Sequence, residues 1–481
     1  MSSSSDVKSV LASAPGKVLI AGGYLVLDRA FQGFVIGTSS RFYSAVQEGA
    51  SARTICVRSP QFEKAVWRYD LIEKEGEVAL VPRVSEGENK FVQICLTCCL
   101  SVVFSAPTKR AAEVAIQKGL DIQVFGDNDF YSQREQLKSL QLPLTVKSLE
   151  QLPHFCPTKS TLGNVHKTGL GSSAALITSL VASVLVYFNV TSTKDLSAHE
   201  DRILVHNTAQ LVHCLAQGKI GSGFDVSAAV WGSHTYRRFS PNVLEAAMED
   251  PTNTEVVIRT IAPSNSSWDN EVTSFQLPPS HYLMLADIDA GSHTPTLVSK
   301  VLAWRKANPQ VAENLWQDLS KSNAALADAL IELQKLAVDD AMEYEAAIEA
   351  CRRQPASKWT HLVEADSENA SLKSMARVHE RSQNSRRLIR EMSELAGVPI
   401  EPPEQTRLLD ACLNVAGVVM CGVPGAGGFD AIYCIVLSNE AMSEVQNLWA
   451  AWKELSVGPL LSREDSAGVT IELDSNIPRS T

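Results

Sequence analysis

The chain has 481 residues, of which 45% are hydrophobic and 20% charged, and its formal net charge at pH 7 is −11. This composition is typical of an ordinary folded protein, and the length allows two or three domains that each bury a core. The negative charge argues against general binding to nucleic acids or anionic membranes, so an anionic substrate would need locally concentrated positive charge.

No segment has the character of a membrane anchor or a signal peptide. The longest apolar run, residues 174–188, is too short and too rich in serine and threonine to span a bilayer, and residues 1–6 are polar. Ten cysteines in so long a chain suggest free thiols, so we expect a cytoplasmic protein. Cys95, Cys98 and Cys99 resemble half of a metal site, but no second cluster follows, and their neighbours favour a packed helix.

Short apolar runs separated by turns fill the first part of the chain. Residues 10–14 and 18–21 predict strand on either side of Pro15-Gly16-Lys17. We expect these three residues to form a turn from which Lys17 reaches a site, although most lysines in isolation are simply exposed. The remaining runs favour a largely antiparallel or mixed sheet. Its further strands are predicted at residues 33–37, 54–57, 65–69 and 121–125, with one helix at residues 91–104.

A glycine-rich loop, residues 167–175, leads into an apolar segment that predicts a buried helix over residues 176–188. Its two glycines allow close backbone approach, its serines carry hydroxyls, and the helix start offers free N–H groups at the positive end of the dipole. These features suit a bound phosphate, but a glycine-rich turn with a serine N-cap explains them equally well. The chain has no G-x-x-x-x-G-K-[ST] motif, and the Rossmann-like G-x-G-x-x-A spacing here lacks the strand that must precede it.

A second helix is predicted over residues 194–217, in which His199, His206 and His213 recur every seven residues. That spacing separates neighbours by about 10 Å along a helix axis, too far to share a metal, so a partly buried helix stripe is expected. The loop that follows gathers glycines, a lysine and Asp225, which either serves a site or caps a turn. Two adjacent arginines come next, at positions 237 and 238, and on a strand at most one of them can face a common site.

The second half of the chain begins with a polar stretch, residues 240–251, that suggests a domain boundary. Residues 253–280 then predict a hairpin or meander. A buried strand at residues 282–288 leads to a cluster of small hydroxyl side chains, which either contact an acid substrate or form a strand-to-helix turn. Helices are predicted at residues 323–350, 371–395 and 408–415, and strands at residues 417–421 and 430–437, with a glycine loop between the two strands at residues 424–428 that suits a ligand or a plain β-turn.

The order of three motifs along the chain is the most informative feature. Ala14-Pro15-Gly16-Lys17 comes first, Gly169-Leu170-Gly171-Ser172-Ser173-Ala174 lies in the middle, and Pro424-Gly425-Ala426-Gly427-Gly428 comes near the C-terminus. Over nearly the whole chain, this order resembles that of the GHMP small-molecule kinases. Tyr24 after two glycines, Lys167-Thr168 directly before the middle motif, and residues 217–226 are similar to the eukaryotic, fungal-type branch, whose acceptor is 5-phosphomevalonate.

The resemblance implies an α+β fold with two domains. Residues 1–245 would form the ATP-binding domain, which is similar to the second domain of ribosomal protein S5, and residues 246–481 would form a ferredoxin-like domain. It also implies transfer of a phosphoryl group from ATP, with Mg²⁺, to 5-phosphomevalonate in the cleft between the domains. A monomer or weak dimer that binds neither nucleic acid nor membrane is expected.

The same resemblance assigns roles to single residues. Lys17 and Asp225 are expected to be catalytic, and Ser173 is expected to help to hold Mg²⁺. The expected ATP-binding residues are Lys167, Thr168, Gly169, Leu170, Gly171, Ser172, Ser173, Ala174 and Ala175. The expected acceptor-binding residues are Lys17, Tyr24, Lys219, Ser222, Gly223, Arg237, Arg238, Ser292, His293, Thr294, Gly425, Ala426, Gly427 and Gly428.

One position departs from the family pattern. Mevalonate kinases carry a Mg²⁺-binding glutamate eleven residues before the catalytic aspartate, whereas this chain has Cys214 there. Because a phosphate acceptor is already largely ionised at pH 7, Asp225 is expected mainly to orient Lys17, Mg²⁺ or the acceptor rather than to remove a proton. Three alternatives stay open: another acceptor such as mevalonate, a ligand sensor that has lost turnover, and a structural protein with incidental glycine loops.

Overall fold

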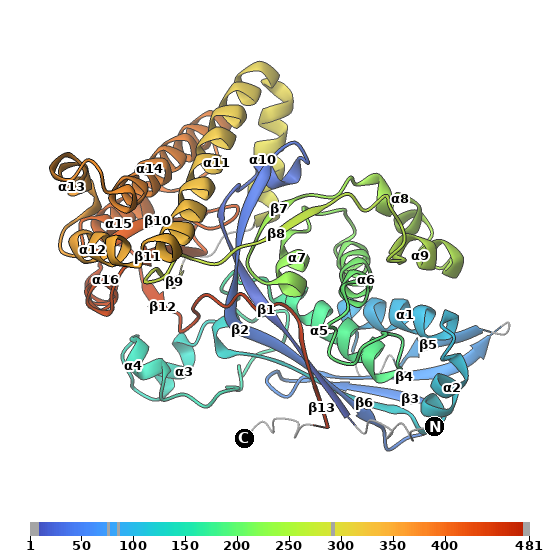
Figure 1. The fold of residues 1–481 in the computed structure, drawn as a ribbon. Coiled ribbons are helices and arrows are strands. Elements are labelled where there is room, and N and C mark those ends of the chain that lie inside the picture. The colour runs from blue at the N-terminus through green and yellow to red at the C-terminus, as the bar shows by residue number, and fades with distance from the viewer. Residues whose placement is uncertain (1–8, 75–76, 84–86, 290–293, 475–481) are drawn as a thin grey trace.

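The computed structural model describes residues 9–74, 77–83, 87–289 and 294–474. Within these ranges the strands form two separate sheets (Figure 1). The larger runs in the order β13-β1-β2-β6-β3-β4-β5, with β7 beside β2 and β8 beside β7, and the smaller runs in the order β10-β11-β9-β12. The large sheet comprises β1 (Ser9–Ala21), β2 (Gln32–Glu48), β3 (Thr54–Arg58), β4 (Val66–Lys74), β5 (Glu77–Pro82), β6 (Leu120–Gly126), β7 (His234–Arg237), β8 (Glu271–Ser274) and β13 (Thr470–Leu473). The small sheet comprises β9 (Tyr282–Ile288), β10 (Val418–Gly422), β11 (Ala431–Val436) and β12 (Val457–Pro459).

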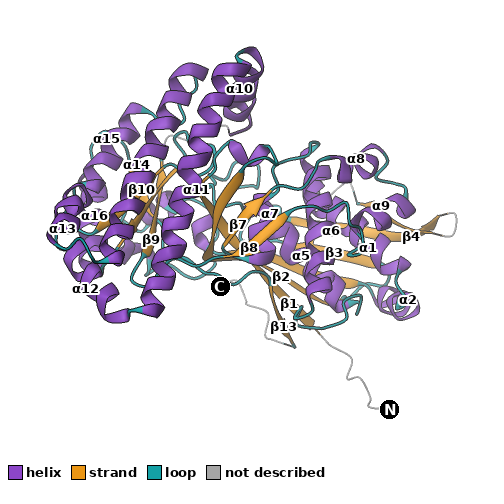
Figure 2. Cartoon of the chain, turned by 45° about the horizontal axis from the view of Figure 1, so that its top comes forward, coloured by secondary structure: helices purple, strands orange, loops and turns teal. Residues whose placement is uncertain are grey.

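The large sheet is mixed, as its apolar runs predicted. Strand β3 lies parallel to β6, and the other paired neighbours in this sheet are antiparallel. Helices gather on one face of it, where α5 packs on β1 and β2 and is flanked by α1, α6 and α7 (Figure 2). The helices of this half are α1 (Lys90–Ser105), α2 (Lys109–Lys118), α3 (Arg134–Ser139), α4 (Val146–Leu149), α5 (Ser172–Tyr187), α6 (His199–Gln217), α7 (Phe224–Trp231), α8 (Asn242–Glu249) and α9 (Thr254–Ile261).

The predicted helices of this half are present. Cys95, Cys98 and Cys99 lie buried on α1, which confirms a packed helix. The histidine stripe of α6 is uneven, because His206 and His213 are buried while His199 is exposed.

The small sheet is antiparallel and carries a helical layer. Helices α14 and α15 pack on β10, and α16 packs on β12. Helix α11 lies along α14, and the apolar residues of α10, α11 and α14 enclose Tyr24, Leu25 and Phe31 from the loop after β1. This contact joins the two halves next to that loop. The helices are α10 (Thr294–Ala307), α11 (Pro309–Asp339), α12 (Ala341–Cys351), α13 (Trp359–Ala365), α14 (Ala370–Ala396), α15 (Pro403–Leu413) and α16 (Asn439–Ala451).

The expected turn at Pro15-Gly16-Lys17 is wrong. Strand β1 runs through these residues without a break, and its register against β2 shifts between Pro15 and Lys17, as at a β-bulge. A Cβ on Gly16 would lie 2.7 Å from Thr38 Oγ1 and 3.0 Å from Leu170 O, so only glycine fits this close approach. Because a bulge re-aims the side chain next to it, the fold directs Lys17 without ending the strand.

The expected hairpin or meander over residues 253–280 is also wrong. This stretch contains helix α9 and strand β8. Asn253 caps the helix by accepting a hydrogen bond from the backbone N–H of Val256 at 3.2 Å, and Val257 and Ile261 face the core at helical spacing. β-branched side chains, in which α9 is rich, also suit strands, but the cap and the buried face favour a helix here.

The last described strand returns to the first sheet. Strand β13 pairs with β1, and β8 pairs with β7, although both follow residue 245 in the sequence. The domain boundary after residue 245 stays a prediction. The pairing of β13 with β1 and of β8 with β7 makes both strands part of the large sheet.

Glu464, on the segment that leads back to β13, makes stability depend on pH. Its Oε1 accepts a hydrogen bond from the backbone N–H of Leu277 at 2.8 Å, and burial raises the pKa of this carboxyl from 4.5 to about 7. The folded state therefore holds the proton more tightly than the unfolded state. The resulting stabilisation is complete below pH 4.5 and is lost as pH rises through about 7.

We expect Glu464→Gln to be more stable than the wild type by about 2 kcal/mol at pH 8, because the amide keeps the acceptor oxygen but never carries the buried charge. Below pH 4.5 the two proteins should unfold alike. Urea unfolding at both pH values measures this difference, with Glu113→Gln on the exposed face of α2 as the control. An equal free-energy difference at the two pH values would contradict the assignment.

Candidate active site

One cleft of about 410 Å³, open to solvent, collects residues from distant parts of the chain. They come from β1 and the loop after it, from the loop before α5, from the end of α6 with the start of α7, and from the loop between β10 and β11. This volume lies within the roughly 300–1,000 Å³ that is typical of small-molecule sites, so the cleft suits small-molecule ligands. Among the residues expected at the site, those that line it are Lys17, Tyr24, Lys167, Thr168, Gly169, Leu170, Gly171, Ser172, Ser173, Lys219, Ser222, Gly223, Asp225, Gly425, Ala426 and Gly427.

Other expected residues are placed differently. Ala174, Ala175, Gly428, Arg237 and Arg238 are not among the residues that line the cleft. Ser292 and His293 lie outside the described residues, and Thr294 is described only as the first residue of α10.

The loop before α5 presents backbone N–H groups to the cleft. Gly169 and Gly171 both have φ near +81°, a left-handed conformation that strains any side-chain-bearing residue. Gly171 is the N-cap of α5, and the first helical hydrogen bond runs from the N–H of Ala175 to its carbonyl oxygen. The N–H groups of Ser172 and Ser173 come before that bond, at the positive end of the helix dipole, so this corner of the cleft suits an anion.

Buried contacts hold this loop in place from behind. The hydroxyl of Thr168 donates to the backbone carbonyl of Asp129, and its backbone N–H donates to the carbonyl of Phe130 at 3.2 Å. The backbone N–H of Lys17 donates to the carbonyl oxygen of Leu170 at 2.9 Å. The bulge in β1 and the glycine loop are therefore fixed to each other.

Lys17 lies at the centre of the cleft. Its Nζ donates to the carbonyl oxygen of Gly169 at 2.7 Å and stands 5.5 Å from the ring centre of Phe224. Desolvation lowers the pKa of the Lys17 ammonium, while the charges of Asp225 and Asp430 act in the opposite direction. A cation held between the start of α5 and two carboxylates can stabilise charge that shifts between two anionic ligands.

Asp225 stands in the first turn of α7 and faces the start of α5. Its Oδ1 accepts a hydrogen bond from the N–H of Val226 at 3.0 Å, and its Oδ2 lies 3.8 Å from His213 Nε2. The turn before α7 is closely packed: Gly223 has φ +82°, and a Cβ there would lie 2.7 Å from Gln210 Oε1. The aspartate therefore projects from a rigid loop.

The two arginines bind different main-chain carbonyls, and strand β7 ends at Arg237, so alternation along a strand does not apply to Arg238. Arg238 donates to the carbonyl oxygens of Leu27 at 2.6 Å and Gly221 at 2.7 Å, and so joins the loop after β1 to the loop before α7. Arg237 donates to Glu271 at 3.2 Å and to the carbonyl of Ala30 at 2.9 Å. Both arginines support the cleft from outside rather than line it.

The second glycine loop closes the opposite wall. The N–H of Gly425 donates to the carbonyl of Leu19 at 3.0 Å, and the phenol of Tyr24 donates to the carbonyl of Ala426 at 2.7 Å. The loop approaches Gly23 so closely that a Cβ there would lie 2.2 Å from Gly425 O. These contacts hold the two halves of the molecule together across the cleft.

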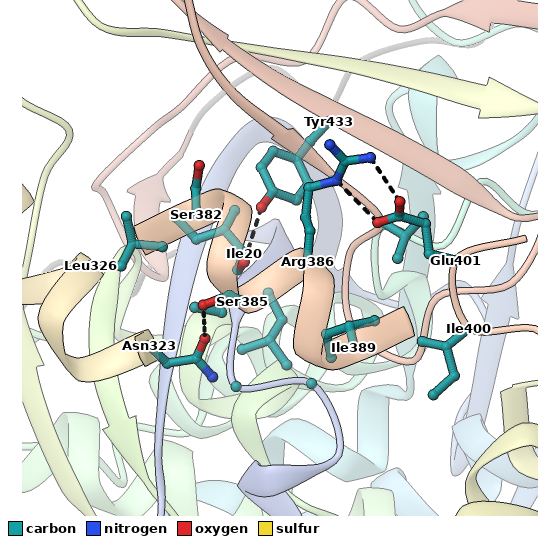
Figure 3. A pocket seen from close by; sticks show the side chains of 17 residues that line it. Ile20, Asn323, Leu326, Ser382, Ser385, Arg386, Ile389, Ile400, Glu401 and Tyr433 are labelled. Atoms are coloured by element: carbon teal, nitrogen blue, oxygen red, sulfur yellow. Dashed lines mark hydrogen bonds and ion pairs between the residues drawn. The ribbon is translucent and has the colours of Figure 1, made fainter. Parts of the chain in front are cut away.

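A much smaller cavity of about 40 Å³ lies behind this loop and shares Leu19 and Gly425 with the cleft. In it, Arg386 pairs with the fully buried Glu401 at 2.7 Å, and Tyr433 donates to the carbonyl of Ile20 at 3.1 Å (Figure 3). The phenol therefore fixes the end of β1 from outside the cleft.

Among the polar side chains that line the cleft, sequence patterns missed three: His213, Gln217 and Asp430. The seven-residue spacing of three histidines suggested one shared stripe on the helix, so the last of them, His213, was not considered by itself. One signal was present, because residues 213 and 217 share a helix face that ends at the loop containing Asp225. Asp430 follows the second glycine loop directly and carried no signal of its own.

No helix in the described part of the chain is long and apolar enough to cross a membrane. Within the same residues, no three His, Cys, Asp or Glu side chains come together closely enough to hold a metal by themselves.

Comparison with known proteins supports the resemblance. The family described as GHMP kinases C terminal matches residues 371–454. The peroxisomal phosphomevalonate kinase of Arabidopsis thaliana is 40% identical over 98% of this chain and 97% of its own length. The phosphomevalonate kinase of Aspergillus fumigatus is 36% identical, over 92% of this chain and 90% of its own.

Among solved structures, a Listeria innocua protein shares the fold with a TM-score of 0.64 at 14% identity, covering 97% of this chain and 100% of that one. The phosphomevalonate kinase of Streptococcus pneumoniae, in complex with phosphomevalonate and AMPPNP, aligns with a TM-score of 0.56 at 13% identity, covering 95% of this chain and 99% of that one. The expected α+β, two-domain GHMP kinase fold is therefore confirmed. With relatives this similar over nearly its full length, the chain belongs to the phosphomevalonate kinases of the GHMP kinase family.

Proposed function

We propose that this cleft transfers the γ-phosphoryl group of ATP to the phosphate of (R)-5-phosphomevalonate, giving ADP and (R)-5-diphosphomevalonate. A bond forms between an acceptor phosphate oxygen and the γ-phosphorus as the bond from that phosphorus to the β–γ bridging oxygen breaks. The observation that carries the proposal is the meeting of Lys17, Asp225 and the start of α5 in one cleft. The family to which the chain belongs gives the acceptor.

The residues divide between the two ligands. The ATP phosphates would lie against residues 169–173, whose N–H groups and helix dipole suit them. The acceptor would lie toward Tyr24, Ser222 and the second glycine loop, and Lys17 would bridge the two. Lys167 and Lys219 add positive charge to the same cleft, which offsets the repulsion between two polyanions in a protein of net charge −11.

The donor set fits Mg²⁺ held mainly by the nucleotide. Magnesium prefers oxygen ligands and is usually held by one or two protein oxygens together with substrate phosphates. Ser173 and Asp225 offer a hydroxyl and a carboxylate on the same wall of the cleft. Bound there, the ion would neutralise charge on the transferring phosphoryl group, while the protein's own residues hold the reactants in line.

Lys17 and Asp225 then have distinct tasks. Lys17 stabilises the charge on the transferring group from a fixed position beside Gly169. Asp225 orients Lys17 and the nucleotide, because the acceptor phosphate has a second pKa near 6 and needs little help to lose a proton.

The substrate assignment is tested by measuring ADP release with two acceptors. We expect phosphomevalonate to be preferred over mevalonate by at least about 100-fold in kcat/KM, since the lysines of the cleft match an acceptor that bears a phosphate. A preference for mevalonate would overturn the acceptor. ATP binding without ADP release on either acceptor would favour a ligand sensor instead.

We also propose that the protein works in the cytosol. All ten cysteines are free thiols, which suits a reducing compartment. Because the Arabidopsis relative is named as peroxisomal, imaging of a fluorescent fusion beside cytosolic and peroxisomal markers is the required test. Fluorescence confined to peroxisomes would overturn the cytosolic assignment.

A matched pair of glycine substitutions tests whether the loop before α5 positions Lys17. Gly169 and Gly171 have the same positive φ, but a Cβ on Gly171 would lie 3.1 Å from Lys17 Cε, whereas a Cβ on Gly169 meets nothing within 4 Å. We expect Gly171→Ala to have a kcat about ten-fold lower than Gly169→Ala, because only the first displaces the lysine. Both should lose similar stability, about 1–2 kcal/mol, from the left-handed backbone. Equal kcat values would show that the loop does not set the position of Lys17.

A further inference from the structure

His213 is a buried residue of the cleft with no role in the chemistry described so far. It lies one turn before the end of α6 and is 4% exposed. Its Nε2 stands 3.1 Å from Ser173 Oγ, 2.9 Å from Gln217 Nε2 and 3.8 Å from Asp225 Oδ2. One ring nitrogen therefore faces both residues that fit a metal ion.

The neighbouring position does not share this environment. Cys214 is 1% exposed, is absent from the cleft lining, and accepts a hydrogen bond from Gln210 Nε2 at 3.3 Å. The family pattern pointed to position 214 for an acidic side chain beside the metal. The helix instead turns position 213 toward the cleft, so a histidine occupies the place beside Ser173 and Asp225.

The contacts of His213 Nε2 agree with one arrangement of the protons around Ser173. The amide nitrogen of Gln217 can only donate, so His213 Nε2 accepts and carries no hydrogen. The Ser173 hydroxyl then donates to the same nitrogen and shares that nitrogen's single lone pair with Gln217. With its proton turned to the imidazole, Ser173 Oγ keeps its lone pairs for another partner in the cleft. The Asp225 carboxylate receives no hydrogen bond from this nitrogen and also stays available.

We propose that His213 is a positioning residue that holds the Ser173 hydroxyl with its lone pairs toward the nucleotide and its Mg²⁺, and that Gln217 fixes the tautomer this requires. The inference rests on the proposed function for the presence of the metal–nucleotide complex. A hydroxyl can ligate a cation only through its lone pairs, and a partner that accepts its proton strengthens it as a ligand. A neutral imidazole does this without adding negative charge to a cleft that must hold two phosphate-bearing ligands.

The test compares ATP binding with and without Mg²⁺ by calorimetry in the full-length protein. The gain is defined as the ratio of the ATP affinity with Mg²⁺ to the ATP affinity in EDTA. For His213→Ala we expect this gain to fall about ten-fold, while the ATP affinity in EDTA stays unchanged. We expect kcat of the same variant to fall about 10–100-fold. His213→Gln presents an acceptor oxygen near the position of Nε2 and should keep the gain within about three-fold of wild type. Gln217→Leu, at an exposed position where folding is not at risk, should reduce the gain in the same direction but less.

His206→Ala is the matched control, because His206 is equally buried on the same helix and lies outside the cleft lining. It should leave the Mg²⁺-dependent gain unchanged whatever it does to stability. Equal loss of affinity with and without Mg²⁺ in His213→Ala, or no rescue by glutamine, would overturn the proposal. If phosphomevalonate is not a substrate but the binding results are as expected, the acceptor assignment fails and the role of His213 stands.

Discussion

Replacing Lys17 with methionine is expected to lower kcat by on the order of 10³-fold while making the folded protein more stable at neutral pH. The methionine keeps most of the length and volume of the side chain but removes the ammonium that faces Asp225 and Asp430. It also removes the hydrogen bond to the carbonyl of Gly169. Charge on the transferring phosphoryl group would then lack its fixed protein cation.

The gain in stability follows from the direction of the pKa shift. Desolvation lowers the pKa of Lys17 below 10.5 and outweighs the two carboxylates, so the charged form is less favourable in the folded state than in the unfolded state. The penalty is present at pH values below the folded-state pKa and fades as pH rises toward 10.5. A neutral side chain removes the penalty at pH 7, so the stability difference between variant and wild type should shrink in alkaline solution.

ADP-release assays measure the loss of kcat, and urea unfolding at pH 7 and pH 10 measures the stability. Lys219→Met is the control, since it removes an exposed cation from the same cleft. Its kcat should stay within about ten-fold of wild type, with the larger change in KM. If Lys17→Met keeps the kcat of the wild type, Lys17 does not stabilise the transferring group. If the variant is less stable than the wild type at pH 7, the desolvation argument is contradicted.

The parts of the fold that local patterns determine were predicted from the sequence. The continuous apolar run after Ser173 identified α5, and the glycines on either side of Leu170 marked the loop with positive φ values. The bulge in β1 could not be predicted in this way, because it depends on the close approach of Gly16 to Thr38 and to the carbonyl of Leu170, far along the chain. The proline and glycine in the local sequence predicted a turn. In the folded chain, the close approach of Gly16 to Thr38 and Leu170 is compatible with a continuous strand.

The candidate site was predictable to a similar extent. Motif order brought together Lys17, the loop before α5 and the second glycine loop, because each has a local signature. His213 offered only the weak signal of a helix face that ends at the Asp225 loop, because its importance comes from the packing of α6 on α5, which brings Nε2 to Ser173. Arg238 shows the opposite case: a cation next to a glycine loop suggested a ligand, but the folded chain uses it to bind backbone carbonyls.

Replacing Asp225 with asparagine is expected to lower kcat by about 10²–10³-fold and to move the alkaline limb of the pH–rate profile to lower pH. The Asp225 charge acts to raise the pKa of Lys17 against desolvation, and it is the larger of the two carboxylate contributions. Without it, the ammonium of Lys17 loses its proton at a lower pH, so the active form disappears sooner as the solution becomes alkaline. Asp430→Asn should move the limb in the same direction by less.

The profile also separates the orienting role of Asp225 from that of a general base. The acid limb should be retained in Asp225→Asn, because it follows the ionisation of the acceptor phosphate, with a second pKa near 6, rather than that of the aspartate. Loss of the acid limb together with an unchanged affinity for phosphomevalonate would assign proton removal to Asp225. If both limbs of the pH–rate profile of Asp225→Asn coincide with those of the wild type, Asp225 does not act through Lys17. Its effect on kcat would then come from holding the metal–nucleotide complex beside Ser173 and His213.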